Sequence, residues 1–203
     1  MNDTCCCYEF ETLHFSRPAF RFVRVSYLIT MKGSTRREQY MKQLREHRPT
    51  RTVVVVHNSG YKTCKKKGVS SPAQDLWHAN QVVSEHSRPH DSVLILEDDV
   101  LFTDSFRFRA REIDRVVDGK VRANRAFAYS LGSLSFLSVP QRWNEHIRLL
   151  SGGFAHAVVY TRPALDRFQR MKIPRWGLHD ILVFTRFETY APWTSCAVQR
   201  YER

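Results

Sequence analysis

The chain has 203 residues and a formal net charge of +12, from 32 Lys and Arg against 20 Asp and Glu. This length suits one domain with a single core, and the charge indicates a polyanionic partner: phosphates, anionic lipid, acidic glycan or nucleic acid. The longest apolar runs are far too short to cross a membrane, and the N-terminus has neither the basic start nor the apolar core of a secretory signal.

The first 21 residues have a mixed composition that predicts a loosely ordered tail. They contain three of the five cysteines, the adjacent Cys5, Cys6 and Cys7. Adjacent cysteines rarely bridge one another and the total is odd, so the sequence makes a poor disulfide framework. We therefore expect reduced cysteines and a cytoplasmic, soluble protein.

Two strands with a helix between them follow. Residues 22–30 (FVRVSYLIT) alternate as a strand does, and Thr35 and Glu38 have the spacing of a capping box that starts a helix ending before Pro49. Residues 53–56 are four valines, which indicate a second, buried strand. Most of the excess positive charge lies in this early third, including a basic loop of four lysines that is either solvated or contacts an anionic ligand: Lys62, Lys65, Lys66 and Lys67.

A second helix is predicted over residues 72–87, because Ser71, Pro72 and Gln74 combine an N-cap, a first-turn proline and a capping glutamine. It leads into residues 92–96, a buried strand that ends in three acids. Parallel strands place their carboxyl ends at one edge of a sheet, where ligands bind. Thr30, His57 and the acids should therefore share that edge, with His57 and Asn58 either contacting a nucleotide or forming only a polar turn.

The acids are Glu97, Asp98 and Asp99, and apolar residues 100–102 follow them. Carboxylate oxygens suit Mg²⁺ or Mn²⁺, and a cation held there can bridge a diphosphate. The alternative is an acidic turn that caps the next segment. The second half is less regular, with short strands at 127–130 and 135–139, a glycine turn entering a strand within 149–160, and a helix at 163–171.

The motif at residues 94–100 (LILEDDV) resembles that of nucleotide-sugar glycosyltransferases with the GT-A fold, and is similar to glycosyltransferase family 25, which includes lipopolysaccharide-type enzymes and procollagen galactosyltransferases. The resemblance implies one α/β, Rossmann-like domain with a mixed, mainly parallel sheet flanked by helices. Residues 22–102 would be its nucleotide-binding half and residues 103–203 its acceptor-binding half. It also implies that Asp99 binds the metal, with Glu97 and Asp98 near ribose or donor sugar.

Weaker correspondences extend the resemblance. Thr30 and Arg36 match the opening strand and Arg-containing helix that contact the donor nucleotide, although Thr30 and Met31 stand where the family usually has Asn and Leu. Gly153 lies in a glycine-rich segment similar to one that lines the donor sugar. Asp180 matches the carboxylate that removes the acceptor proton in inverting enzymes, and its alternative role is to cap a following helix.

The sequence thus predicts a metal-dependent glycosyltransferase that moves a sugar from a nucleoside-diphosphate donor, by resemblance a UDP-sugar, to a glycan, glycolipid or glycoprotein. Its positive surface could also contact an anionic membrane. Two alternatives stay open: another metal-dependent nucleotide enzyme such as a nucleotidyltransferase, and a nonenzymatic nucleic-acid-binding protein. The latter explains the charge but leaves the acidic strand unexplained, because those acids would repel phosphate.

Overall fold

The computed structural model describes residues 7–132, 134–140, 146–153, 156–173 and 186–199. Within these ranges the chain forms a large sheet with strand order β1-β3-β2-β4-β9-β6-β10-β8-β7 and a small sheet of β5 and β11. The helices are α1 (Arg37–His47), α2 (Pro72–His86), α3 (Phe106–Arg122) and α4 (Arg162–Arg170). The strands are β1 (Tyr8–His14), β2 (Val25–Met31), β3 (Thr52–Asn58), β4 (Ser92–Glu97), β5 (Val100–Phe102), β6 (Phe127–Ser130), β7 (Leu134–Pro140), β8 (His146–Gly153), β9 (Ala157–Thr161), β10 (Glu188–Pro192) and β11 (Ala197–Gln199).

The predicted α/β class and mixed sheet are confirmed. Strands β3, β2 and β4 are parallel neighbours, in a register that pairs Thr30 with His57 and Ile29 with Glu97. Their carboxyl ends therefore meet at one edge, as expected. Elsewhere in the described sheet the pairing is antiparallel, except between β10 and β6.

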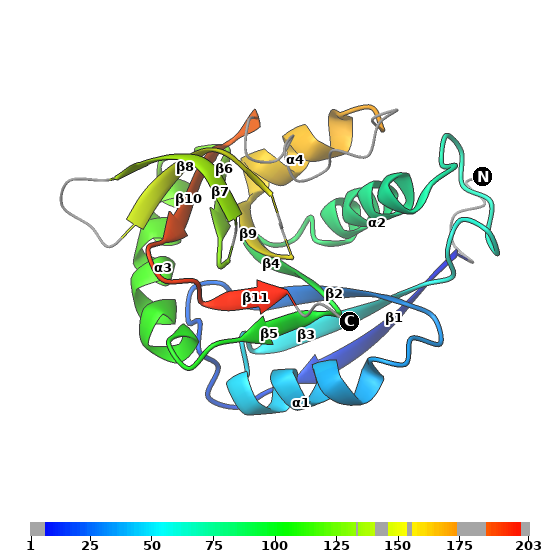
Figure 1. The fold of residues 1–203 in the computed structure, drawn as a ribbon, viewed down its shortest axis with the longest axis horizontal. Coiled ribbons are helices and arrows are strands. Elements are labelled where there is room, and N and C mark those ends of the chain that lie inside the picture. Colours follow the sequence, from blue (N-terminus) through cyan, green and yellow to red (C-terminus); the bar gives the residue numbers. More distant parts are fainter. Residues whose placement is uncertain (1–6, 133, 141–145, 154–155, 174–185, 200–203) are drawn as a thin grey trace.

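Helices cover both faces of the sheet (Figure 1). On one face α2 and α4 pack against each other, with the rings of Trp77 and Phe168 4.4 Å apart. On the other face α1 and α3 bury Tyr40, Leu44 and Phe106 against alternate residues of the same strands. Because successive strand residues point to opposite faces, the four valines of β3 supply both cores. None of the helices described is long and apolar enough to cross a bilayer.

The two predicted helix starts have different outcomes. Helix α2 begins at Pro72, and Ser71 Oγ accepts a hydrogen bond from Gln74 N at 3.3 Å, which confirms the cap. The predicted Thr35–Glu38 capping box is wrong, because α1 begins at Arg37 with Arg36 at its N-cap and without a side-chain cap.

The predicted loose tail is also wrong for residues 8–14, which form β1 along the whole of β3. Cys7 lies beside this strand and forms a disulfide with Cys64, with the two Cα atoms 5.6 Å apart. The expectation of unpaired cysteines failed because it considered only neighbours in sequence, whereas the fold brings together residues 57 positions apart. The cysteines therefore no longer argue for a reducing compartment.

Helix α3 holds the segment before β2 in place through Asp114. Its carboxylate accepts hydrogen bonds from the backbone N–H groups of Arg21, Phe22 and Val23, at 2.5, 3.1 and 3.2 Å. Burial raises the pKa of Asp114, although these donors oppose the shift. The segment leads directly into β2, so this cluster fixes where the first parallel strand begins.

We expect Asp114→Ala to lower the free energy of unfolding by about 2 kcal/mol, because it leaves the buried N–H of Val23 and two partly buried N–H groups without an acceptor. The measurement is urea denaturation followed by circular dichroism. Asp118→Ala is the matched control on the same helix, since Asp118 bonds only the exposed Arg122 among the contacts described. Equal losses in the two variants would contradict this role of Asp114.

Candidate functional site at the acidic edge of the sheet

The acids that follow β4 bind the neighbouring segments rather than facing open solvent. Asp98 accepts hydrogen bonds from Thr30 Oγ1 at 2.7 Å, Ser34 Oγ at 2.9 Å and Arg36 Nη1 at 3.2 Å. Ser34 Oγ also accepts the backbone N–H of Arg36 at 3.2 Å. One carboxylate thus joins the ends of β2 and β4 to the start of α1.

Asp99 is buried, with 7% of its surface exposed. Its Oδ2 accepts a hydrogen bond from Gln199 Nε2 at 2.7 Å, and Arg36 Nη1 lies 3.9 Å away. Its Oδ1 is buried and has no hydrogen-bond partner among the described residues. A buried carboxylate oxygen without a donor is costly, so this atom is suited to bind a cation or a ligand group.

A pocket of about 340 Å³ adjoins Glu97 and Asp98. Its walls are the ends of three parallel strands and the first turn of α2, an arrangement that suits a nucleotide in this type of sheet. The lining residues are Ile29, Thr30, Met31, Asn58, Tyr61, Pro72, Asp75, Leu76, Glu97 and Asp98. The turn after β3 depends on Gly60, whose φ is +78° and whose N–H donates to Asn58 Oδ1 at 2.9 Å.

A buried ion pair supports the wall of this pocket. Lys66 Nζ lies 2.5 Å from Asp75 Oδ1 and 2.5 Å from Asn58 Oδ1, and the Lys66 side chain is fully buried. Asp75 Oδ2 also accepts from Asn58 Nδ2 at 3.0 Å and Tyr61 N at 3.1 Å. Lys66 is therefore committed within the protein and is not part of a solvated basic run. Removing one partner of such a pair leaves a buried charge uncompensated.

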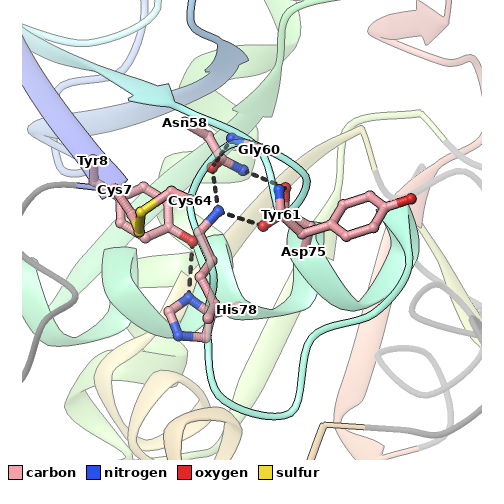
Figure 2. The surroundings of a disulfide bond; sticks show 9 residues. Cys7, Tyr8, Asn58, Gly60, Tyr61, Cys64, Asp75 and His78 are labelled. Carbon is pink, nitrogen blue, oxygen red and sulfur yellow. Dashed lines mark hydrogen bonds and ion pairs between the residues drawn. A yellow bond between two sulfur atoms is a disulfide. The ribbon is translucent and has the colours of Figure 1, made fainter.

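The disulfide lies beside this pocket wall (Figure 2). It connects the start of β1 to the loop that contains Tyr61, while Tyr8 Oη bonds His78 Nδ1 of α2 at 2.8 Å. Burial, and secondarily the charge of Asp75, raise the pKa of Tyr8 well above its ordinary value, so Tyr8 stays neutral there. The edge strand, the loop and α2 thus form one connected support.

Several predicted site residues meet at this edge. Thr30, Arg36, Asp98 and Asp99 are linked by the contacts above, and Glu97 lies in the pocket wall with its N–H donating to His156 O at 2.9 Å. Asn58 lies in the same wall, on the side that faces α2.

The other predicted site residues are elsewhere. His57 is turned toward the α1 face, where its Nε2 lies 3.2 Å from Glu11 Oε2. Gly153 ends β8, opposite Leu134. Asp180 lies outside the described residues.

The sequence did not identify Ser34, Tyr61, Asp75 and Gln199 as site residues. Asp75 stood on a correctly predicted helix, and its place in the first turn after the second strand was a usable signal. Gln199 has no local signal, because it is 100 residues from the acid it contacts.

The carboxylates at this edge could supply some, but not all, of the ligands of a metal ion. Within the described ranges there is no group of three His, Cys, Asp or Glu side chains that could hold a metal ion. Asp98 already accepts three hydrogen bonds from the protein, whereas Asp99 Oδ1 accepts none among the described residues. A magnesium-type ion is commonly held by one or two carboxylates, with substrate phosphates and water completing its shell. The site thus suits a cation that binds together with a phosphate ligand.

Comparison with known proteins supports the fold. No protein-family model matches the chain, and no curated protein matches it. The crystal structure of A197 from STIV is similar, with a TM-score of 0.52 and 15% identity, covering 89% of this chain and 87% of A197. A glycosyltransferase involved in the glycosylation of the major capsid of PBCV-1 is a more distant neighbour, with a TM-score of 0.40 and 10% identity over 72% of this chain and 64% of that protein. At these identities the likeness to A197 shows the Rossmann-like fold alone.

We expect reductant to lower the melting temperature of the wild-type protein, because a native disulfide typically contributes about 2–4 kcal/mol. The measurement is thermal unfolding with and without dithiothreitol. The Cys7→Ser/Cys64→Ser variant should melt at the lower temperature in both conditions. Cys196 should not interfere, since burial raises the pKa of its thiol to about 11 and suppresses exchange. An unchanged wild-type melting temperature in reductant would contradict the pairing.

Proposed function

We propose that the protein is a glycosyltransferase that uses a nucleoside-diphosphate sugar. One observation carries the proposal: Asp99, whose Oδ1 is buried and has no hydrogen-bond partner among the described residues, directly follows Glu97 and Asp98, which line a pocket at the carboxyl ends of β2, β3 and β4. Ligands of open α/β sheets bind at this edge. The resemblance of residues 94–100 to GT-A glycosyltransferases, family 25 in particular, then selects a sugar nucleotide among possible ligands.

The pocket would hold the nucleoside and the acids would face the diphosphate and sugar. Tyr61 and Leu76 offer apolar surface to a base. Arg36 is partly exposed and lies between the two aspartates, so its guanidinium is positioned to reach a phosphate. We propose UDP as the nucleotide from the family resemblance.

The cation would be Mn²⁺ or Mg²⁺, held by Asp99 and the donor phosphates, and it would offset the charge that develops on the leaving diphosphate. In the transfer, the bond between the anomeric carbon and the diphosphate oxygen breaks, and its electron pair leaves with the nucleotide. The acceptor hydroxyl oxygen bonds the same carbon and loses its proton. We propose Asp180 as the base that takes this proton and a glycan, glycolipid or glycoprotein as the acceptor.

We expect UDP to bind the wild-type protein in a manganese-dependent manner, and Asp99→Asn to weaken that binding roughly tenfold or more, because it removes a charged ligand oxygen. The measurement is isothermal titration calorimetry with a panel of nucleoside diphosphates, with and without manganese.

Asp104→Asn is the matched control, since Asp104 is an exposed acid five positions further along the chain. It should bind UDP as the wild type does. The proposal fails if no nucleoside diphosphate binds, or if Asp99→Asn and Asp104→Asn bind equally well.

A further inference from the structure

A second hollow, of about 960 Å³, lies away from the acids. It is formed by the segment before β2, the residue before β3 and the first turns of α3. Six of its lining residues are arginines: Arg17, Arg21, Arg24, Arg51, Arg107 and Arg111. Its other lining residues are Pro18, Ala19, Phe20 and Phe108, so no acid takes part.

This hollow is distinct from the proposed donor site. Arg24 and Arg51 immediately precede β2 and β3, whereas the acids and the 340 Å³ pocket lie at the opposite, carboxyl ends of the parallel strands. A ligand in the hollow is therefore separated from the donor by the length of the strands.

The side chains of these arginines have no acid in close contact within the described part of the chain, although Arg21 interacts electrostatically with Asp114. None of the six forms an ion pair with another described residue, and all six are exposed. The neighbouring acid, Asp114, uses its oxygens for the backbone N–H groups of residues 21–23. Six guanidinium groups around one hollow attract anions, and each can bind a phosphate in a bidentate manner.

Phe108 gives the hollow an apolar part. It is 87% exposed, although Phe106 on the same helix is fully buried. An aromatic ring that stays exposed adds little to the stability of the fold. A ligand that placed apolar or ring atoms against Phe108 would bury this ring. Aromatic and arginine side chains together are favoured at binding surfaces.

We infer that the hollow binds a ligand that carries several phosphate groups, with an apolar or ring portion against Phe108. Two sources share this chemistry: a free phosphorylated compound, and the headgroups of an anionic phospholipid membrane whose chains would meet Phe108. The inference does not depend on the glycosyltransferase proposal, because it uses none of the residues of the acidic edge.

The test uses two probes with the full-length protein. Inorganic tripolyphosphate is titrated by calorimetry, and vesicles of phosphatidylcholine with or without phosphatidylglycerol are assayed by sedimentation. Arg107→Ala/Arg111→Ala should weaken binding of the effective probe roughly tenfold or more, because it removes two charged donors.

The matched control is Arg115→Ala/Arg122→Ala, which removes the same charge from the same helix outside the hollow. It should change affinity by no more than about twofold, since distant exposed charges are screened. Thermal melting of both variants checks that they fold.

The outcomes separate the sources. Tripolyphosphate binding without vesicle binding identifies a free phosphate ligand. Binding to phosphatidylglycerol vesicles that falls in Phe108→Ser, with tripolyphosphate binding unchanged, identifies a membrane. The inference is overturned if the wild type binds neither probe, or if the two double variants lose affinity equally.

Discussion

The carboxylate of Asp98 is the constraint on which the acidic edge depends. Asp98 follows the buried strand β4, and hydrogen bonds from Thr30, Ser34 and Arg36 bring the end of β2 and the start of α1 to it. The same contacts orient Arg36 beside Asp99. Asp98 already accepts three hydrogen bonds from the protein. In the neighbouring Asp99, Oδ1 is buried and has no hydrogen-bond partner among the described residues, so it is the better candidate to bind a cation or a ligand group.

The pocket beside these acids is held by polar groups buried on the other face of the sheet. The Lys66–Asp75 pair fixes the loop after β3 against α2, and the Cys7–Cys64 disulfide ties that loop to the edge strand (Figure 2). A buried ion pair adds little to the free energy of unfolding on balance, since replacing both partners by apolar groups often leaves it unchanged. In this protein the pair positions the pocket wall, because Asp75 also accepts hydrogen bonds from Asn58 and from the backbone of Tyr61.

The parts of the fold that were predictable are those with local signals. A pattern of a few residues was enough to predict three elements: the valines of β3, the capped start of α2 and the apolar run of β4. Because β3 and β4 belong to a set of parallel strands, their carboxyl ends then lie at the same edge of the sheet. Helix α3 had a usable signal that was not recognised: Phe106, Ala110, Ile113 and Val117 recur at helical spacing and are buried.

The rest depends on contacts that no local pattern encodes. Strand β1 lies at the edge of the sheet, so its side chains are mostly exposed and give no clean alternation of apolar and polar residues. Cys64 meets Cys7 only because β1 lies along β3, and Gln199 meets Asp99 only because β11 pairs with β5. The ion pair of Lys66 likewise forms only when α2 brings Asp75 next to it. From the sequence alone, Lys66 therefore looks like one more residue of a basic run.

The most direct measurement is a crystal structure of the protein with UDP and manganese, using the anomalous signal of the metal. The account predicts a manganese peak next to Asp99, with the diphosphate on it and the uridine in the pocket between Thr30 and Asp75. A nucleotide found in the arginine hollow, or a manganese ion away from Asp99, would contradict the claim that the acidic edge of the sheet is the donor site.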